Sequence, residues 1–157
     1  MIYPKDFERK TGFDKIRQML RNECLSPLGK QKAEDIHFST QHNFIIEAID
    51  IADEFIRIIK EEEPFPESHY YDVTESLHKI RIEGMFLEVS ELFDFKRSFE
   101  TIKSIINYLK KGVKGDYPNL KKLTSDITIF PFIFERLNQI ISRHGEIRDN
   151  ASNELQN

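Results

Sequence analysis

The chain has 157 residues, of which 39% are hydrophobic and 32% are charged, a composition typical of a folded globular protein rather than a disordered one. Its formal net charge is −4, and its single cysteine, Cys24, excludes an internal disulfide. No apolar run approaches the ~18 residues of a membrane-spanning helix, and the N-terminal MIYPKDFERK lacks the apolar segment of a signal peptide. We therefore expect a cytoplasmic domain with no membrane partner.

The first predicted helices lie before residue 40. Apolar residues at helical spacing predict an amphipathic helix over 13–24, entered just after Gly12. Ser26 is a favourable N-cap and Pro27 a favourable first helical residue, so a second helix is predicted over 27–36. Gly29, in its first turn, lowers helix propensity and suggests close packing at that position.

The stretch 44–59, FIIEAIDIADEFIRII, is the most apolar helical segment. On a period of 3.6 residues its apolar positions cover more than half of the circumference. The narrow stripe left to face water consists of Glu47, Asp50, Glu54 and Arg57. A helix this broadly apolar is expected to have neighbours on two or three sides. The sequence therefore predicts a central helix over about 42–61, around which the rest of the chain packs.

A second long helix is predicted over about 88–111, with acidic residues in its first turn and lysines in its last, as the helix dipole favours. We expect it to pair with the central helix in an antiparallel manner. Shorter helices are predicted near Leu77, after Pro118 and from Pro131 to Ile141, with Gly145 ending the last. These elements predict an all-α fold: one irregular helical bundle forming a single domain over 1–157.

Motifs for catalysis or cofactor binding are missing from the sequence. Gly29-Lys30 is followed by Gln31 and lacks the upstream glycine of a phosphate-binding loop, and no dinucleotide-binding glycine pattern occurs. The five histidines are not spaced three or four residues apart, so their pattern does not indicate a metal site. We therefore predict no catalytic, cofactor-binding or metal-ligating residue and no enzymatic activity for this segment.

Charge is unevenly distributed along the chain. Residues 34–91 hold 15 acidic and 4 basic residues, whereas residues 103–122 hold six lysines and one acid, Asp116. Lysines that flank a glycine turn can neutralise phosphates without reading bases. The possible nucleic-acid contacts are Lys110, Lys111, Lys114, Lys121 and Lys122. Simple solubility is the alternative explanation of this cluster.

Three segments resemble a known family. FDKIRQMLRNECLSPLGKQKAEDIHFST resembles the opening of the helical core of the MutS family, with its F-D-x-I-x-x-x-L helix followed by a C-L-S-x-L-G-K helix. GEIRDNASNEL, residues 145–155, resembles the G-x-I-x-D-N-A-S-P-E-L segment that introduces the lever helix in the second bacterial MutS paralogue. RIEGMFLEVSELFDFKRSFETI, residues 81–102, is similar to the stretch between them, especially in Bacteroidetes-like members. Asn153 replaces the usual proline, which weakens the helix-start signal. Ser152 still suits an N-cap, so the lever helix is expected to begin near residue 152.

The resemblance implies that the chain is the noncatalytic N-terminal helical core of a larger DNA-repair and anti-recombination protein. That protein would carry a clamp, a dimeric ATPase that uses ATP and magnesium, and a C-terminal endonuclease domain. Its implied partners are the rest of the same chain, a second subunit, branched DNA and, in some bacteria, collided ribosomes. A different class of function remains open: a free-standing protein-interaction module that uses the acidic face between Glu47 and Glu63.

Overall fold

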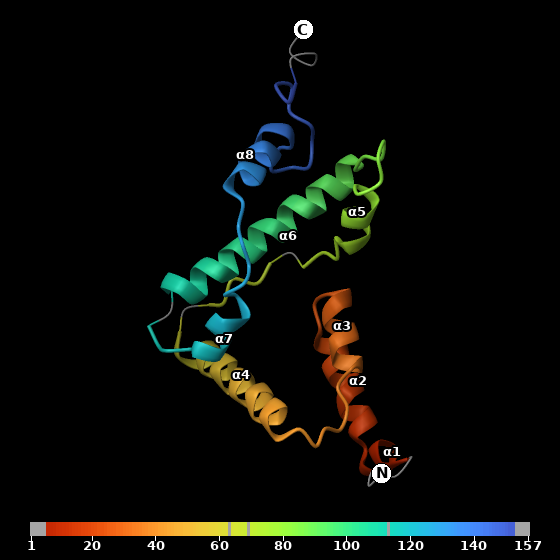
Figure 1. Cartoon of the computed structure of the whole chain (residues 1–157), viewed down its shortest axis with the longest axis vertical. Coiled ribbons are helices and arrows are strands. Elements are labelled where there is room, and N and C mark those ends of the chain that lie inside the picture. Colours follow the sequence, from red (N-terminus) through yellow and green to blue (C-terminus); the bar gives the residue numbers. More distant parts are fainter. Residues whose placement is uncertain (1–5, 63, 69, 113, 153–157) are drawn as a thin grey trace. The chain divides into compact units, whose positions relative to one another are not determined.

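The computed structural model describes residues 6–62, 64–68, 70–112 and 114–152. It is built from helices, and no strand occurs among these residues beyond an isolated antiparallel bridge between Ile141 and Ile147 (Figure 1). The all-α fold class predicted from the sequence is confirmed. The chain divides into two compact units, Met1–Thr40 and Gln41–Asn157. No helix in the described part of the chain is long and apolar enough to cross a membrane.

The first unit contains α1 (Phe7–Thr11), α2 (Phe13–Glu23) and α3 (Pro27–Glu34). Gly12 separates α1 from α2 because its φ of 77° lies in the left-handed region, which ends one helix and turns the chain into the next. The predicted cap of α3 is confirmed, since Ser26 Oγ accepts a hydrogen bond from Gly29 N at 3.0 Å. A Cβ on Gly29 would approach Ser26 Oγ to 3.2 Å, so the glycine permits the close packing expected at this position.

The second unit begins with α4 (His42–Glu61), which has the bounds predicted for the central helix. It continues through α5 (Thr74–Lys79) to α6 (Val89–Asn107), whose last turn runs into a π-helical turn at Tyr108–Gly112. Glu88 and Glu91 form a reciprocal capping box at the start of α6. The short helices α7 (Pro118–Leu123) and α8 (Pro131–Ile140) follow, each with proline in its first turn as predicted.

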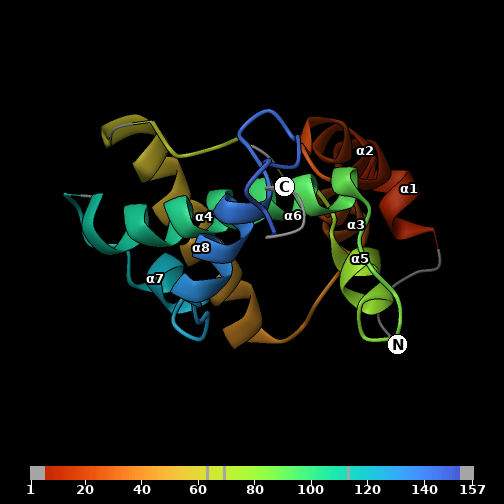
Figure 2. The same cartoon turned by 90° about the horizontal axis from the view of Figure 1, so that it is seen from above.

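The core of the second unit lies where the C-terminal ends of α4 and α6 approach each other. Ile58 of α4 packs with Leu109 of the π-helical turn and with Tyr117 and Leu120 of the α7 region. The predicted antiparallel pairing of the two long helices is therefore wrong: they converge near their C-terminal ends, and α7 lies against α4 (Figure 1). Further along α6, the ring of Phe99 lies 4.9 Å from that of Phe134 in α8, which places α8 beside α6 (Figure 2).

The central helix is more exposed than its composition suggested. Its buried residues are Glu54 and Ile58, whereas Ile49, Ile56 and Ile59 are between 48% and 65% exposed. Among the described residues of the second unit, α4 does not have the neighbours on two or three sides that its composition predicted. The assignment of Glu54 to the water-facing stripe is also wrong, because this residue is only 4% exposed.

Candidate nucleic-acid interface

The five predicted contact lysines lie on one continuous stretch, from the π-helical turn after α6 through the following loop to α7. Lys110 is exposed in the π-helical turn, and Lys114 is exposed in the loop. Lys121 and Lys122 lie in the last turn of α7. The side chain of Lys111 lies outside the described part of the structure. The stretch therefore brings these positions into one region of the second unit.

Two of these lysines are paired with carboxylates. Lys122 Nζ donates to Glu47 Oε1 of α4 at 2.7 Å, and this hydrogen bond, followed by the charge of Glu47, raises the pKa of Lys122. Lys121 Nζ lies 3.4 Å from Asp116 Oδ1. A cation already paired with a carboxylate offers less to an incoming phosphate, because the pair must first be broken or shared. The lysine cluster is therefore weaker as a phosphate site than its sequence suggested.

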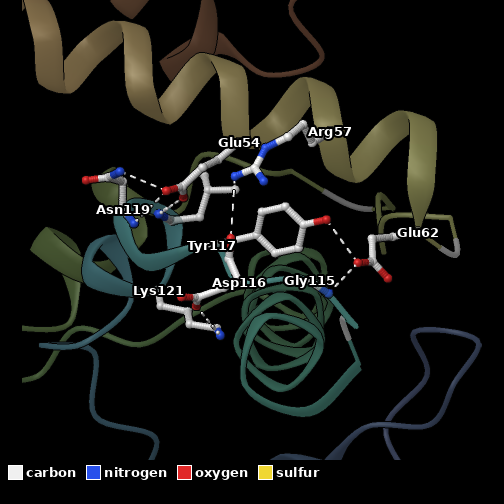
Figure 3. Close-up of polar contacts among 9 residues, drawn as sticks. Glu54, Arg57, Glu62, Gly115, Asp116, Tyr117, Asn119 and Lys121 are labelled. Carbon is white, nitrogen blue, oxygen red and sulfur yellow. Dashed lines mark hydrogen bonds and ion pairs between the residues drawn. The ribbon is translucent and has the colours of Figure 1, made fainter.

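Glu54 of α4 provides the N-terminal cap that α7 lacks in its own sequence. The preceding residue, Tyr117, makes no side-chain cap. Instead, Glu54 Oε1 accepts from Asn119 N at 3.1 Å and Asn119 Nδ2 at 2.7 Å, and Oε2 accepts from Leu120 N at 2.9 Å (Figure 3). A carboxylate at a helix N-terminus satisfies free N–H groups and is favoured by the helix dipole. A buried charge thus joins α4 to α7.

Glu62, just after α4, holds the loop that precedes α7. Its carboxylate accepts hydrogen bonds from Lys114 N at 3.0 Å, Gly115 N at 2.8 Å and Tyr117 Oη at 2.9 Å. The bonds from Lys114 N and Gly115 N lower the pKa of Glu62. Burial, and then the bond to Glu62, raise the pKa of Tyr117. A Cβ at Gly115 would meet Tyr117 Oη at 2.7 Å, so only glycine fits this loop without displacing the ring.

Arg57, near the C-terminal end of α4, completes this junction. Its guanidinium lies 5.1 Å from the centre of the Tyr117 ring, and Nη2 donates to the Asp116 carbonyl at 3.4 Å (Figure 3). Nε lies 3.5 Å from Asp53 Oδ2, one turn earlier. The sequence analysis did not identify this junction as a unit. The available signal was the position of Glu54 within a helix rich in apolar residues and of Glu62 directly after it, eight residues later.

Metal-binding chemistry has no candidate in the described ranges, where no group of three or more His, Cys, Asp or Glu side chains could hold an ion. Cys24, in the first unit, is half-buried, and its Sγ donates to the Leu20 carbonyl at 3.3 Å. The junction around Glu54, Glu62 and Tyr117 consists of internal hydrogen bonds and stacking. Its geometry suits structural rigidity.

Comparison with known proteins gives similarity along nearly the whole chain. No established protein-family profile matches it. The chain is 24% identical over 145 residues to endonuclease MutS2 of Geobacillus sp. (strain WCH70), covering 91% of this chain and 18% of the relative. It is 26% identical over 150 residues to endonuclease MutS2 of Alkaliphilus oremlandii (strain OhILAs), covering 95% and 19%. For endonuclease MutS2 of Staphylococcus aureus (strain MRSA252), the identity is 29% over 148 residues, covering 92% and 19%.

The chain thus spans about a fifth of the length of the curated relatives it matches. The similarity extends over both compact units, since it covers more than nine tenths of the chain. The chain is thus similar to MutS2 proteins along nearly its whole length.

Proposed function

We propose that this chain is a noncatalytic helical core module of a MutS2-like protein that acts on branched DNA in the cytoplasm. The observation that carries the proposal is similarity over 91–95% of the chain to proteins named endonuclease MutS2, of which it covers 18–19%. In this proposal ATP and magnesium are bound by the ATPase region of the longer protein. Dimerisation uses other regions of that protein, and collided ribosomes are a further substrate in some bacteria.

The proposed mechanism is mechanical: the module transmits the state of the ATPase to a DNA-embracing clamp. A module of this kind must be stiff where its helices join. The junction between α4 and α7 supports this requirement, because Glu54 and Glu62 fix two successive segments through six hydrogen bonds from backbone and side-chain donors. A rigid joint of this kind would pass on a rotation of α4 instead of absorbing it.

The exposed side of α4 further supports a place within a larger polypeptide. Ile45, Ile49, Ala52, Ile56 and Ile59 are all exposed, and their spacing alternates between four and three residues. This spacing aligns side chains into one stripe suited to packing against another helix. We propose that a further helix of the MutS2-like polypeptide covers this stripe.

The alternative of a free-standing interaction module relied on an acidic face of α4. Three acids of that face already have partners within the chain: Glu47 binds Lys122, while Glu54 and Glu62 bind the α7 region. The charge available to a basic protein partner is correspondingly smaller. These contacts favour the core-module function.

Reading the coding sequence past codon 157 tests the proposal directly. A continuing lever helix followed in the same reading frame by a phosphate-binding loop is the expected result. A stop codon immediately after Asn157 would refute it and favour the interaction module.

A binding measurement gives a second, independent test. Fluorescence anisotropy with a labelled four-way junction and a matched duplex should show weak binding by this chain alone, in the nonspecific range of ~10⁻⁴ to 10⁻⁶ M at physiological salt. The control changes Lys110, Lys111, Lys114, Lys121 and Lys122 together to glutamine. Nanomolar, junction-selective binding by both proteins would contradict a mainly mechanical role.

A further inference from the structure

A polar cleft lies between α6 and the turn that follows α8, away from the lysine cluster. Its volume is about 350 Å³, which is within the usual range for ligand sites. The lining residues are Phe93, Lys96, Arg97, Glu100, Arg143 and His144. Three basic side chains and one carboxyl group therefore line the cleft. This ratio makes the cleft a candidate site for an anion.

The two walls of the cleft are fixed to each other. Lys96 Nζ donates to the Ile141 carbonyl at 3.0 Å, across 45 positions of sequence. Gly145 has a φ of 84°, and a Cβ there would lie 3.0 Å from the ring of Phe93, so the turn packs closely on α6. Ser142 N also donates to the Glu146 carbonyl at 2.8 Å, which closes the turn. The site is therefore preformed, which reduces the entropic cost of binding a ligand.

Lys96 and Arg97 each contact a neighbouring group that orients the side chain. Lys96 is only 5% exposed, and one of the three N–H donors of its ammonium is directed at the Ile141 carbonyl. The Arg97 guanidinium lies 5.0 Å from the Tyr71 ring centre and 5.1 Å from that of Phe93. Stacking of this kind orients a guanidinium and preserves its charge.

Arg143 adds a fork of donors at the open edge. Its Nε donates to His144 Nε2 at 3.0 Å, and the two terminal nitrogens of the guanidinium carry further N–H donors. Among the described residues, neither Lys96 nor Arg143 forms an ion pair with a carboxylate, in contrast to Lys121 and Lys122. Planar guanidinium groups bind phosphate oxygens through paired hydrogen bonds. Glu100 would repel an anion, but the cations outnumber it.

We propose that this cleft binds a phosphate group, supplied by the backbone of a nucleic acid. The assignment of the source rests on the proposed function, whereas the phosphate chemistry rests on the cleft itself. Lys96 and Arg97 would provide charge at the base of the cleft, and Arg143 would grip phosphate oxygens at its rim. Contacts of this type fix the position of a nucleic acid without reading its sequence.

The first test uses nuclear magnetic resonance on the 157-residue chain. Sodium phosphate is titrated against sodium chloride at matched ionic strength and pH, so that general screening is equal in both. Saturable shifts of the backbone amides of Lys96, Arg97 and residues 143–145, seen with phosphate but not with chloride, are expected. An adventitious response would be spread over all exposed lysines and would not saturate at these amides, and that result would overturn the site.

The second test measures anisotropy of a labelled duplex as a function of salt for the wild type and for Arg143→Gln. The slope of log affinity against log salt should fall by about 0.9 for each phosphate that the variant no longer neutralises. Arg136→Gln is the matched control, because Arg136 is an exposed residue of α8 outside the cleft. Arg143 is exposed, so its substitution should leave the circular dichroism spectrum unchanged.

The outcomes separate the cleft from the proposed function. If the wild type binds duplex DNA and the Arg143→Gln slope equals that of the control, the cleft assignment fails and the proposed function stands. If phosphate shifts the cleft amides while the wild type does not bind DNA even at low salt, the phosphate site stands, and its nucleic-acid source is refuted. Weaker phosphate shifts together with a smaller salt slope in Arg143→Gln support the whole inference.

Discussion

The buried carboxylate of Glu54 offers the sharpest test of how α4 and α7 are joined. Glu54→Ala removes the acceptor for the N–H groups of Asn119 and Leu120 at the start of α7. Each buried donor left unsatisfied costs ~1–3 kcal/mol, and loss of a helix N-cap typically costs ~0.5–2 kcal/mol. These two costs must not be added in full, because the N-cap consists of the same hydrogen bonds. We therefore expect a decrease of ~2–4 kcal/mol in the free energy of unfolding.

The assay is urea denaturation followed by circular dichroism at 222 nm, with the change in midpoint interpreted only where the slopes agree. The control is Glu61→Ala, the same chemical change at an exposed residue of the same helix, which should stay within about 0.5 kcal/mol of the wild type. Glu54→Gln retains one carbonyl acceptor and should lie between the two. Equal midpoints for Glu54→Ala and Glu61→Ala would refute the view that the carboxylate holds α7 in place.

Three further predictions address the core, the acid stability and the absence of nucleotide chemistry. Phe55→Ala should lower the free energy of unfolding by ~2–3 kcal/mol, below the range for a fully buried phenylalanine, because Phe55 is half-buried; its ring lies 5.1 Å from that of Phe65. A urea midpoint equal to that of Glu61→Ala would contradict this. Because the pKa of Glu62 is lowered in the folded state, its carboxylate stabilises the fold fully above the ordinary carboxyl pKa. This contribution to the free energy of unfolding is lost as the pH falls through the lowered pKa. The urea midpoint should therefore fall in acid, and this fall should be smaller for Glu62→Gln. If the midpoint of Glu62→Gln falls in acid as steeply as that of the wild type, the hydrogen bonds of Glu62 do not have this role. Isothermal titration with ATP and magnesium should give no binding, and a stoichiometric heat would overturn the noncatalytic assignment.

Much of the secondary structure could be predicted from the sequence, because its signals are local. The cap at Ser26 depends on a residue three positions away, and the central helix depends on apolar side chains repeating within each turn. Proline in the first turns of α7 and α8 acts through its own backbone geometry. These features require no knowledge of the rest of the chain, so the all-α fold and the bounds of α4 followed directly.

The candidate site could not be predicted in the same way, because its contacts join distant parts of the chain. Glu54 reaches α7 across 65 positions, and Glu47 reaches Lys122 across 75. A periodic pattern shows which side of a helix is polar, but it does not show whether that side contacts water or the N-terminus of another helix. Composition likewise shows six lysines in a short stretch without showing that two of them, Lys121 and Lys122, pair with acids.

The proposed phosphate cleft could not be predicted from the sequence for the same reason. Lys96 and Arg143 do not stand out in the sequence, and only the packing of the 142–146 turn on α6 brings them to one cleft. The sequence by itself determined the helices, their caps and the apolar character of α4. The tertiary structure decided which charges are buried, which are paired and which face an open cleft, because electrostatic interactions depend on distance in space rather than on separation along the chain.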